Sequence, residues 1–189
     1  MYGGKRAAKK PFVISVSGVS GGGKTTIANA LAGRLGNAAV VSFDDYEDIT
    51  LDCDINAWSE DGNNENEWNV EPIVLEIERL WSEPLDYIIL DYPFGYRNLR
   101  VGRYVDFAVF VDTPLDVALA RRTIRDHTDF SVVEKEWRFY LERSRPTYAR
   151  MPEMQKPFSD FAADGMKAPD EIADDVANVL RRSIRKGEE

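Results

Sequence analysis

Cysteine is almost absent from this sequence: Cys53 is the only one among 189 residues. A single thiol allows no intramolecular disulfide and no cysteine metal cluster, which suits a reducing cytoplasm. Basic residues are also in deficit, because 24 Lys and Arg stand against 33 Asp and Glu and leave a net charge of −9. This charge argues against a broad surface for nucleic acid or anionic membrane. We therefore expect neither nucleic acid nor membrane as a partner.

Long apolar runs are missing too, and none approaches the length of a membrane span. Residues 1–10 are basic but lack the apolar stretch of a signal peptide, so we interpret them as a flexible leader of a cytoplasmic protein. The length and the 43 % hydrophobic share predict one globular domain over residues 11–189. His127 is the only histidine, and its surroundings favour a surface or packing role over catalysis.

A glycine-rich segment is present at residues 18–25, with the sequence GVSGGGKT, and it fits G-x-x-x-x-G-K-[ST] at every fixed position. Glycines let successive backbone N–H groups converge on a phosphate chain, and the following helix adds its positive end. Lys24 is expected to reach the β- and γ-phosphates and Thr25 to reach Mg²⁺. This predicts a nucleotide site rather than a structural glycine turn. Its expected contacts are Gly18, Ser20, Gly21, Gly22, Gly23, Lys24, Thr25 and Thr26.

Apolar runs alternate with helical patterns along the rest of the chain. Buried strands are expected at 12–16, 39–43, 87–91, 105–111 and 158–162. Helices are expected after the glycine segment, at 72–81, from 113, at 132–148 with a bend or end near Pro146, and from 169. Such alternation predicts an α/β fold, in which helices cover both faces of a parallel sheet and ligands bind at the carboxyl ends of the strands.

Carboxylates follow two of the expected strands: Asp44 and Asp45 follow the second, and Asp91 ends the third. The guanine-specific Asn-Lys-x-Asp pattern and the Asp-x-x-Gly switch spacing are both absent. Phosphoryl transfer to a hydroxyl needs cations that neutralise the transferred group and a carboxylate that accepts the hydroxyl proton. The residues present match that chemistry.

The chain resembles the uridine kinase and nicotinamide riboside kinase group of P-loop kinases. The resemblance rests on ISVSGVS at 14–20 before KTT at 24–26, SFDDY at 42–46, YLERSRP at 140–146 and KPFSDF at 156–161. It implies a P-loop NTPase three-layer sandwich with a five-stranded parallel sheet of order 2-3-1-4-5. It also implies ATP and Mg²⁺ as cofactors, and an arginine-bearing lid at about residues 121–131.

The resemblance assigns roles to the three aspartates. Asp44, twenty positions after Lys24, matches the catalytic carboxylate, and Asp45 would support Mg²⁺ through water. Asp91 falls where P-loop enzymes place the acid that holds the Mg²⁺ water shell, although uridine kinases tend to carry Glu there. The alternative is that these aspartates cap turns or face solvent, and the choice of Asp44 over Asp45 as the base stays open.

Arg121, Arg122 and Arg125 match the lid of the group. On a helix, residues 121 and 125 share a face while 122 is turned about 100° away, so the three cannot all point at one phosphate. Arg122 and Arg125 are the better pair, and we expect both to act in catalysis. A solvated basic helix face is the alternative.

The acceptor is expected to bind in an excursion over residues 44–72. Trp68 stands where riboside kinases carry a base-stacking aromatic, and Asn69 stands where they carry a ribose-binding aspartate. An amide lacks the charge of that aspartate, and Trp68 can equally be a core residue. Arg97 and Arg100 are further candidates from position alone, and the acidic residues Glu60, Asp61, Glu65 and Glu67 are compatible with a cationic or polyol acceptor.

These patterns predict an ATP-dependent kinase that phosphorylates a hydroxyl of a small molecule, most readily a nucleoside or riboside. A kinase of a sugar, polyol or pantothenate-like alcohol is one alternative. A non-catalytic nucleotide-binding regulator is another, from a different class. The sequence leaves the oligomeric state open, including a homo-oligomer.

Overall fold

The computed structural model describes residues 10–54, 57–58, 61–62, 64–126 and 129–186. Nine of the ten residues of the predicted leader, together with Glu60 and His127, lie outside the described residues. Among the described residues, no helix is both long enough and apolar enough to cross a bilayer.

A parallel sheet of five strands forms the centre of the molecule. Its strands are β1 (Phe12–Gly18), β2 (Ala38–Ser42), β5 (Tyr87–Asp91), β6 (Phe107–Asp112) and β7 (Phe161–Asp164). They lie in the order β2-β5-β1-β6-β7. Counted along the chain, these five strands have the order 2-3-1-4-5, so the predicted topology is confirmed. Central strands read as continuous apolar runs because both of their faces are covered.

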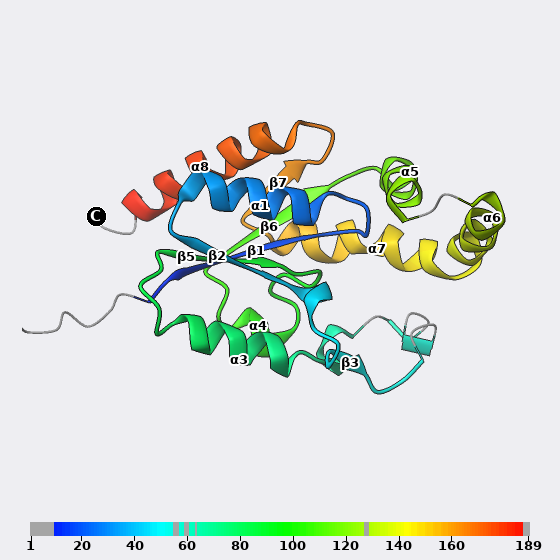
Figure 1. Cartoon of the computed structure of the whole chain (residues 1–189), viewed down its shortest axis with the longest axis horizontal. Coiled ribbons are helices and arrows are strands. Elements are labelled where there is room, and N and C mark those ends of the chain that lie inside the picture. Colours follow the sequence, from blue (N-terminus) through cyan, green and yellow to red (C-terminus); the bar gives the residue numbers. More distant parts are fainter. Residues whose placement is uncertain (1–9, 55–56, 59–60, 63, 127–128, 187–189) are drawn as a thin grey trace, which may run out of the picture.

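Helices cover both faces of this sheet (Figure 1). The helices α1 (Lys24–Leu35) and α8 (Pro169–Lys186) lie on one face, where Ile27, Leu31 and Val176 pack against the strands. The helices α3 (Glu71–Leu80) and α4 (Leu99–Gly102) lie on the other. The α3 side chains predicted to face inward, Ile73, Ile77 and Leu80, are all buried. The result is the three-layer sandwich expected from the alternating pattern.

The register of the sheet brings several carboxyl ends together at one edge. Val16 of β1 pairs with Asp91 of β5, and Ser42 of β2 pairs with the same residue. Gly18 pairs with Val111 of β6. The glycine loop, Asp91 and the residues after β2 therefore share this edge, where parallel α/β sheets bind their ligands.

A helical arm projects from this edge (Figure 1). It consists of α5 (Leu115–Asp126), α6 (Phe130–Phe139), a π-helical turn η3 (Tyr140–Ser144) and α7 (Arg145–Gln155). The α-helical hydrogen bonding over the predicted helix of residues 132–148 is interrupted close to Pro146, by the π turn directly before it, and helix then continues past residue 148 to Gln155. Pro146 has no N–H to donate to the preceding turn, so an interruption at this place agrees with its chemistry.

Two shorter segments complete the chain. The excursion after β2 contains the turn η1 (Phe43–Asp45), strand β3 (Thr50–Leu51), turn η2 (Glu65–Glu67) and strand β4 (Trp68–Asn69). Strand β3 pairs antiparallel with β4.

The last predicted strand begins later than expected. Lys156–Phe158 form a 3₁₀ turn, η4, and the strand starts at Phe161, where its backbone pairs with Val109.

Candidate active site

The glycine loop between β1 and α1 is closed by its own backbone and by α5. The Gly22 N–H donates to the Val19 carbonyl at 2.9 Å. Gly21 has a φ of 78°, and a Cβ on it would lie 2.1 Å from the carbonyl oxygen of Ala118 in α5. Only glycine fits there, because a side chain would meet backbone and the conformation is left-handed. The helix that leads into the arm thus packs directly on the loop.

Lys24 begins α1, and its half-buried ammonium donates to the Val19 carbonyl at 3.3 Å. Burial lowers the pKa of Lys24; the negative charges of Asp91 and Asp44 oppose this, and Arg125 adds to it. The loop lysine, the two carboxylates and one arginine of the arm therefore interact electrostatically. A lysine held in this way is suited to a polyanionic ligand.

Asp91 is buried at the end of β5 and accepts a 2.6 Å hydrogen bond from the Thr25 hydroxyl through Oδ2. Burial raises the pKa of Asp91, against the hydrogen bond from Thr25 and the charge of Lys24. Its other oxygen, Oδ1, is buried and has no hydrogen-bond partner among the described residues. An orphaned carboxylate oxygen beside a hydroxyl is a donor set that fits Mg²⁺.

Within the described part of the chain, no three His, Cys, Asp or Glu side chains gather as a metal site. Mg²⁺ is commonly held by one or two protein oxygens, water and substrate phosphates. Thr25 and Asp91 supply the protein oxygens, and a bound nucleotide would supply the phosphates.

One cavity of about 320 Å³ joins the loop to the excursion and to α7. Its size is within the range of small-molecule sites. From the loop side it is lined by Gly18, Ser20, Lys24 and Asp91, and Asp44 lines it too. Its other walls come from Phe43, Trp58, Glu65, Trp68, Pro93, Phe94, Thr147, Tyr148, Met151, Met154 and Gln155.

The structure separates the adjacent aspartates Asp44 and Asp45. Both follow β2 in the turn η1 and are exposed, but of the two only Asp44 is among the described residues that line the cavity. The negative charge of Asp44 also acts to raise the pKa values of Lys24, Asp91 and Arg125. Of the two aspartates, Asp44 is therefore the one that a ligand in the cavity would meet.

Trp68 and Asn69 are likewise separated. The Trp68 ring lines the cavity and meets the rings of Phe43 and Trp58 edge-on, with centroids 5.7 and 5.9 Å away. Asn69 is not among the described cavity residues. Its side chain accepts from the N–H of Glu71 at 3.2 Å and so supports the start of α3. Trp68 therefore packs against its neighbours and also offers surface to a ligand.

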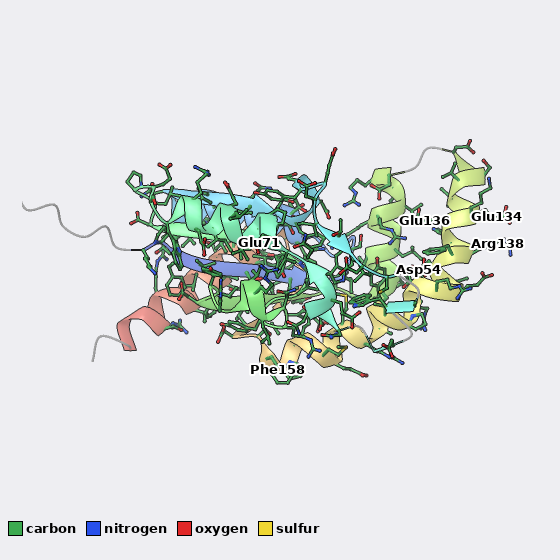
Figure 2. The ribbon with its side chains drawn as sticks, turned by 90° about the horizontal axis from the view of Figure 1, so that it is seen from below. Asp54, Glu71, Glu134, Glu136, Arg138 and Phe158 are labelled. Atoms are coloured by element: carbon green, nitrogen blue, oxygen red, sulfur yellow. The ribbon has the colours of Figure 1, made fainter. Side chains whose placement is uncertain are left out.

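The three arginines of α5 point to different partners. Arg122 forms an ion pair with Glu136 of α6, and its Nη1 donates to the Tyr148 hydroxyl at 3.4 Å. Figure 2 shows Glu136 between α5 and α6, whereas Glu134 and Arg138 lie on the outer side of α6. Arg121 donates to the Gly165 carbonyl at 3.1 Å. The described residues that line the cavity include none of these arginines.

Arg125 has a different environment. Asp126 raises its pKa through hydrogen bonds of 2.5 and 2.9 Å, and Asp44 contributes to the same shift. Arg125 is thus the arginine of this helix whose charge reaches Asp44 and Lys24. Arg122 and Arg125 both interact with Glu136, Arg122 through an ion pair and Arg125 through the charge of that carboxylate, and the joint catalytic role predicted for them stays a prediction.

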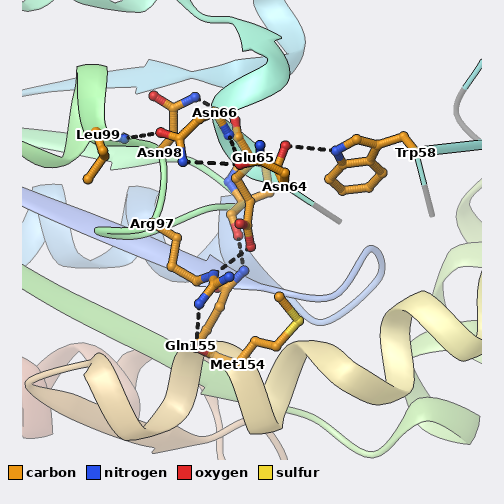
Figure 3. A network of polar contacts seen from close by, with 10 residues as sticks. Trp58, Asn64, Glu65, Asn66, Arg97, Asn98, Leu99, Met154 and Gln155 are labelled. Atoms are coloured by element: carbon orange, nitrogen blue, oxygen red, sulfur yellow. Dashed lines mark hydrogen bonds and ion pairs between the residues drawn. The ribbon is translucent and has the colours of Figure 1, made fainter. Parts of the chain in front are cut away.

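A polar network that the sequence did not reveal forms part of the cavity wall (Figure 3). Arg97 donates through Nε to the buried carboxylate of Glu65 at 2.7 Å and through Nη1 to the Met154 carbonyl at 3.5 Å. Gln155 donates to the Pro93 carbonyl at 2.8 Å. Arg97 therefore supports a cavity residue instead of lining the cavity, and Arg100 pairs with Glu71 away from it.

A comparison of the sequence with models of protein families found no match. The curated relatives include the uridine kinase of Borrelia duttonii (strain Ly), which is 29% identical over 177 residues and covers 79% of this chain and 84% of the relative. The uridine kinase of Lactiplantibacillus plantarum is 26% identical over 208 residues, which cover 93% of this chain and 97% of the relative.

Solved structures with a similar fold include a sugar kinase from Janibacter sp. HTCC2649, with a TM-score of 0.58 and 16% identity over 90% of this chain and 95% of that one. A shikimate kinase from Acinetobacter baumannii has a TM-score of 0.54 and 15% identity over 93% of this chain and 96% of that one. The predicted P-loop α/β fold is confirmed. The kinases among the curated relatives and the structural neighbours indicate that the chain is a phosphotransferase that acts on a hydroxyl group.

Proposed function

We propose that this protein is an ATP-dependent kinase that transfers the γ-phosphate to a hydroxyl of a small nucleoside- or riboside-like molecule. The observation that carries the proposal is one cavity that holds the loop lysine, Asp44 and a set of aromatic walls. Flat aromatic surface suits a planar ring, and the nearby carboxylate suits a hydroxyl. The similarity to uridine kinases over most of the chain supports the same acceptor class.

In the proposed reaction, each group of residues in and around the cavity has a separate role. Asp44 orients the acceptor hydroxyl and takes its proton as the oxygen attacks the γ-phosphorus, and the bond to the β–γ bridging oxygen breaks to release ADP. Lys24 and Arg125 offset the negative charge of the transferred group. Thr25 and Asp91 would hold Mg²⁺, with Asp45 as a further contact through water, and the bound metal would neutralise phosphate charge. Ser20, the loop glycines and Thr26 complete the phosphate cradle.

Acceptor-stimulated ADP release tests this function. With ATP and Mg²⁺, we expect a nucleoside or riboside to raise ADP release at least about tenfold over the basal rate. The same panel includes sugars, polyols and pantothenate. Stimulation by these compounds alone would contradict the proposed acceptor class. Nucleotide binding without stimulation by any acceptor would instead favour a regulator.

Asp91→Asn tests the metal site. We expect the Mg²⁺ concentration for half-maximal activity to rise at least about tenfold, because the amide carries no charge for the cation. In the wild type, burial raises the pKa of Asp91, so the proton competes with Mg²⁺ at a higher pH than at an exposed aspartate. Asp170→Asn, on the exposed first turn of α8, is the control. Identical Mg²⁺ titrations for both variants would exclude the assignment.

A further inference from the structure

Gln155, the last residue of α7, lines the cavity and carries an acceptor that has no hydrogen-bond partner among the described residues. The residue is only 5% exposed. Its Nε2 donates to the Pro93 carbonyl at 2.8 Å, and a carbonyl can only accept, so the amide cannot be turned round. Its Oε1 is buried and has no hydrogen-bond partner among the described residues. Such an oxygen favours any ligand or water that donates to it.

Glu65 adds a second acceptor to the same cavity. Its side chain is 6% exposed and is fixed by Arg97, while the buried Asn98 amide donates to its backbone carbonyl at 2.7 Å. Figure 3 shows Glu65, Arg97, Met154 and Gln155 in one network. Of these two charged partners, only Glu65 is among the described residues that line the cavity, so the ion pair meets the cavity through Glu65. This part of the wall therefore prefers hydrogen-bond donors.

Much of the remaining cavity surface is apolar and aromatic, and one of its rings, Trp68, has a buried Nε1 donor with no hydrogen-bond partner among the described residues. Phe43, Trp68 and Phe94 contact one another, Trp58 contacts Trp68, and Met151 and Met154 lie on the α7 side. A planar ring fits against such walls. An amino substituent on that ring would donate to Gln155 and Glu65, whereas a carbonyl oxygen in its place would face two acceptors with no proton between them.

We propose that Gln155 and Glu65 determine acceptor specificity and select a riboside whose ring carries an amino group over one whose ring carries a carbonyl oxygen at that place. This inference rests on the proposed function and names the acceptor class of the same site. Arg97 acts as a positioning residue, because it holds Glu65 without lining the cavity itself.

Cytidine and uridine are suitable probes, because their rings differ chiefly by an amino group in place of a carbonyl. For the wild type, we expect kcat/KM to be at least about tenfold higher with cytidine. Gln155→Met keeps the length of the side chain and removes the acceptor. It is expected to lower kcat/KM about tenfold for cytidine and less than about threefold for uridine. Glu153→Met, on an exposed position of the same helix, is the matched control and should retain the wild-type ratio.

The outcomes separate this inference from the proposed function. Equal or better use of uridine by the wild type overturns the selection and leaves nucleoside kinase activity in place. An equal loss with both nucleosides in Gln155→Met also overturns it, because a purely structural role would produce that pattern. If neither nucleoside nor any other riboside is phosphorylated, the proposed function and this inference both fail. The wild-type ratio decides the matter if Gln155→Met does not fold.

Discussion

Asp44→Asn is expected to lower kcat for phosphoryl transfer about 10²- to 10⁴-fold, the usual contribution of a positioned acid–base group. Asparagine keeps the shape and one hydrogen-bonding oxygen of the side chain, but it cannot take the proton of the acceptor hydroxyl. Asp44 lines the cavity that also holds Lys24 and Asp91. Because the carboxylate acts on the acceptor, nucleotide affinity should stay within about threefold of the wild type. Single-turnover transfer and nucleotide binding measure the two quantities.

Asp45→Asn is the matched comparison, since the two residues are adjacent, exposed and of the same type. We expect its effect on kcat to be at least about tenfold smaller than that of Asp44→Asn. A shift in Mg²⁺ requirement confined to Asp45→Asn would agree with a water-mediated metal contact. Near wild-type transfer by Asp44→Asn, or a larger loss in Asp45→Asn, would move the role of base away from Asp44.

The sheet and its covering helices could be predicted because their signals are local and agree with one another. The run of residues 12–16, the glycine motif and the apolar spacing of Ile27 and Leu31 all predict one strand–loop–helix unit, and β1 and α1 form it. Pro72 near the start of α3 and Pro169 at the start of α8 marked two further helices correctly. Strand order followed from the resemblance and not from any local pattern.

The arm could be predicted only in part. Pro146 indicated a bend or an end of the helix, and the π turn lies directly before it, but the sequence did not indicate that helix continues to Gln155. The partner of Arg122 could not be predicted either. The spacing of Arg122 with Arg125 suggested a shared phosphate, while its partner in the structure is Glu136, on another helix. Local spacing cannot reveal an ion pair between separate helices.

No sequence motif predicts the wall of the cavity that lies away from the glycine loop and is formed by Glu65 and α7. Gln155 and Pro93 are 62 positions apart, and Arg97 and Glu65 are 32 apart. Glu65 was recognisable only as one of several acidic residues, and Gln155, Tyr148, Met151 and Met154 fit no motif. Folding brings them together because α7 returns from the arm to the end of the sheet. The phosphate side of the site is encoded in contiguous residues, whereas the acceptor side depends on tertiary packing.

Lys24→Met is expected to lower kcat/KM for ATP-dependent transfer about 10²- to 10³-fold, as for loss of one charge-stabilising donor in a transition state. Methionine nearly matches the length of the lysine stem and removes only the ammonium, which in the wild type contacts the Val19 carbonyl and interacts with Asp91 and Asp44. Lys167→Met, at an exposed ion pair with Asp175, is the control for a lost surface charge. Equal activity of the two variants would contradict the role of Lys24.

The same substitution should not destabilise the nucleotide-free protein, and this separates a functional lysine from a structural one. Burial lowers the pKa of Lys24 in the folded state, so the unfolded chain binds the extra proton between that lowered pKa and the model-peptide value of 10.5. Wild-type stability therefore rises as the pH rises through this window, and the charged ammonium opposes folding below it. Lys24→Met removes this dependence, so its Tm at neutral pH should equal or exceed that of the wild type. A Tm lowered by more than about 4 °C would show instead that the ammonium holds the loop together.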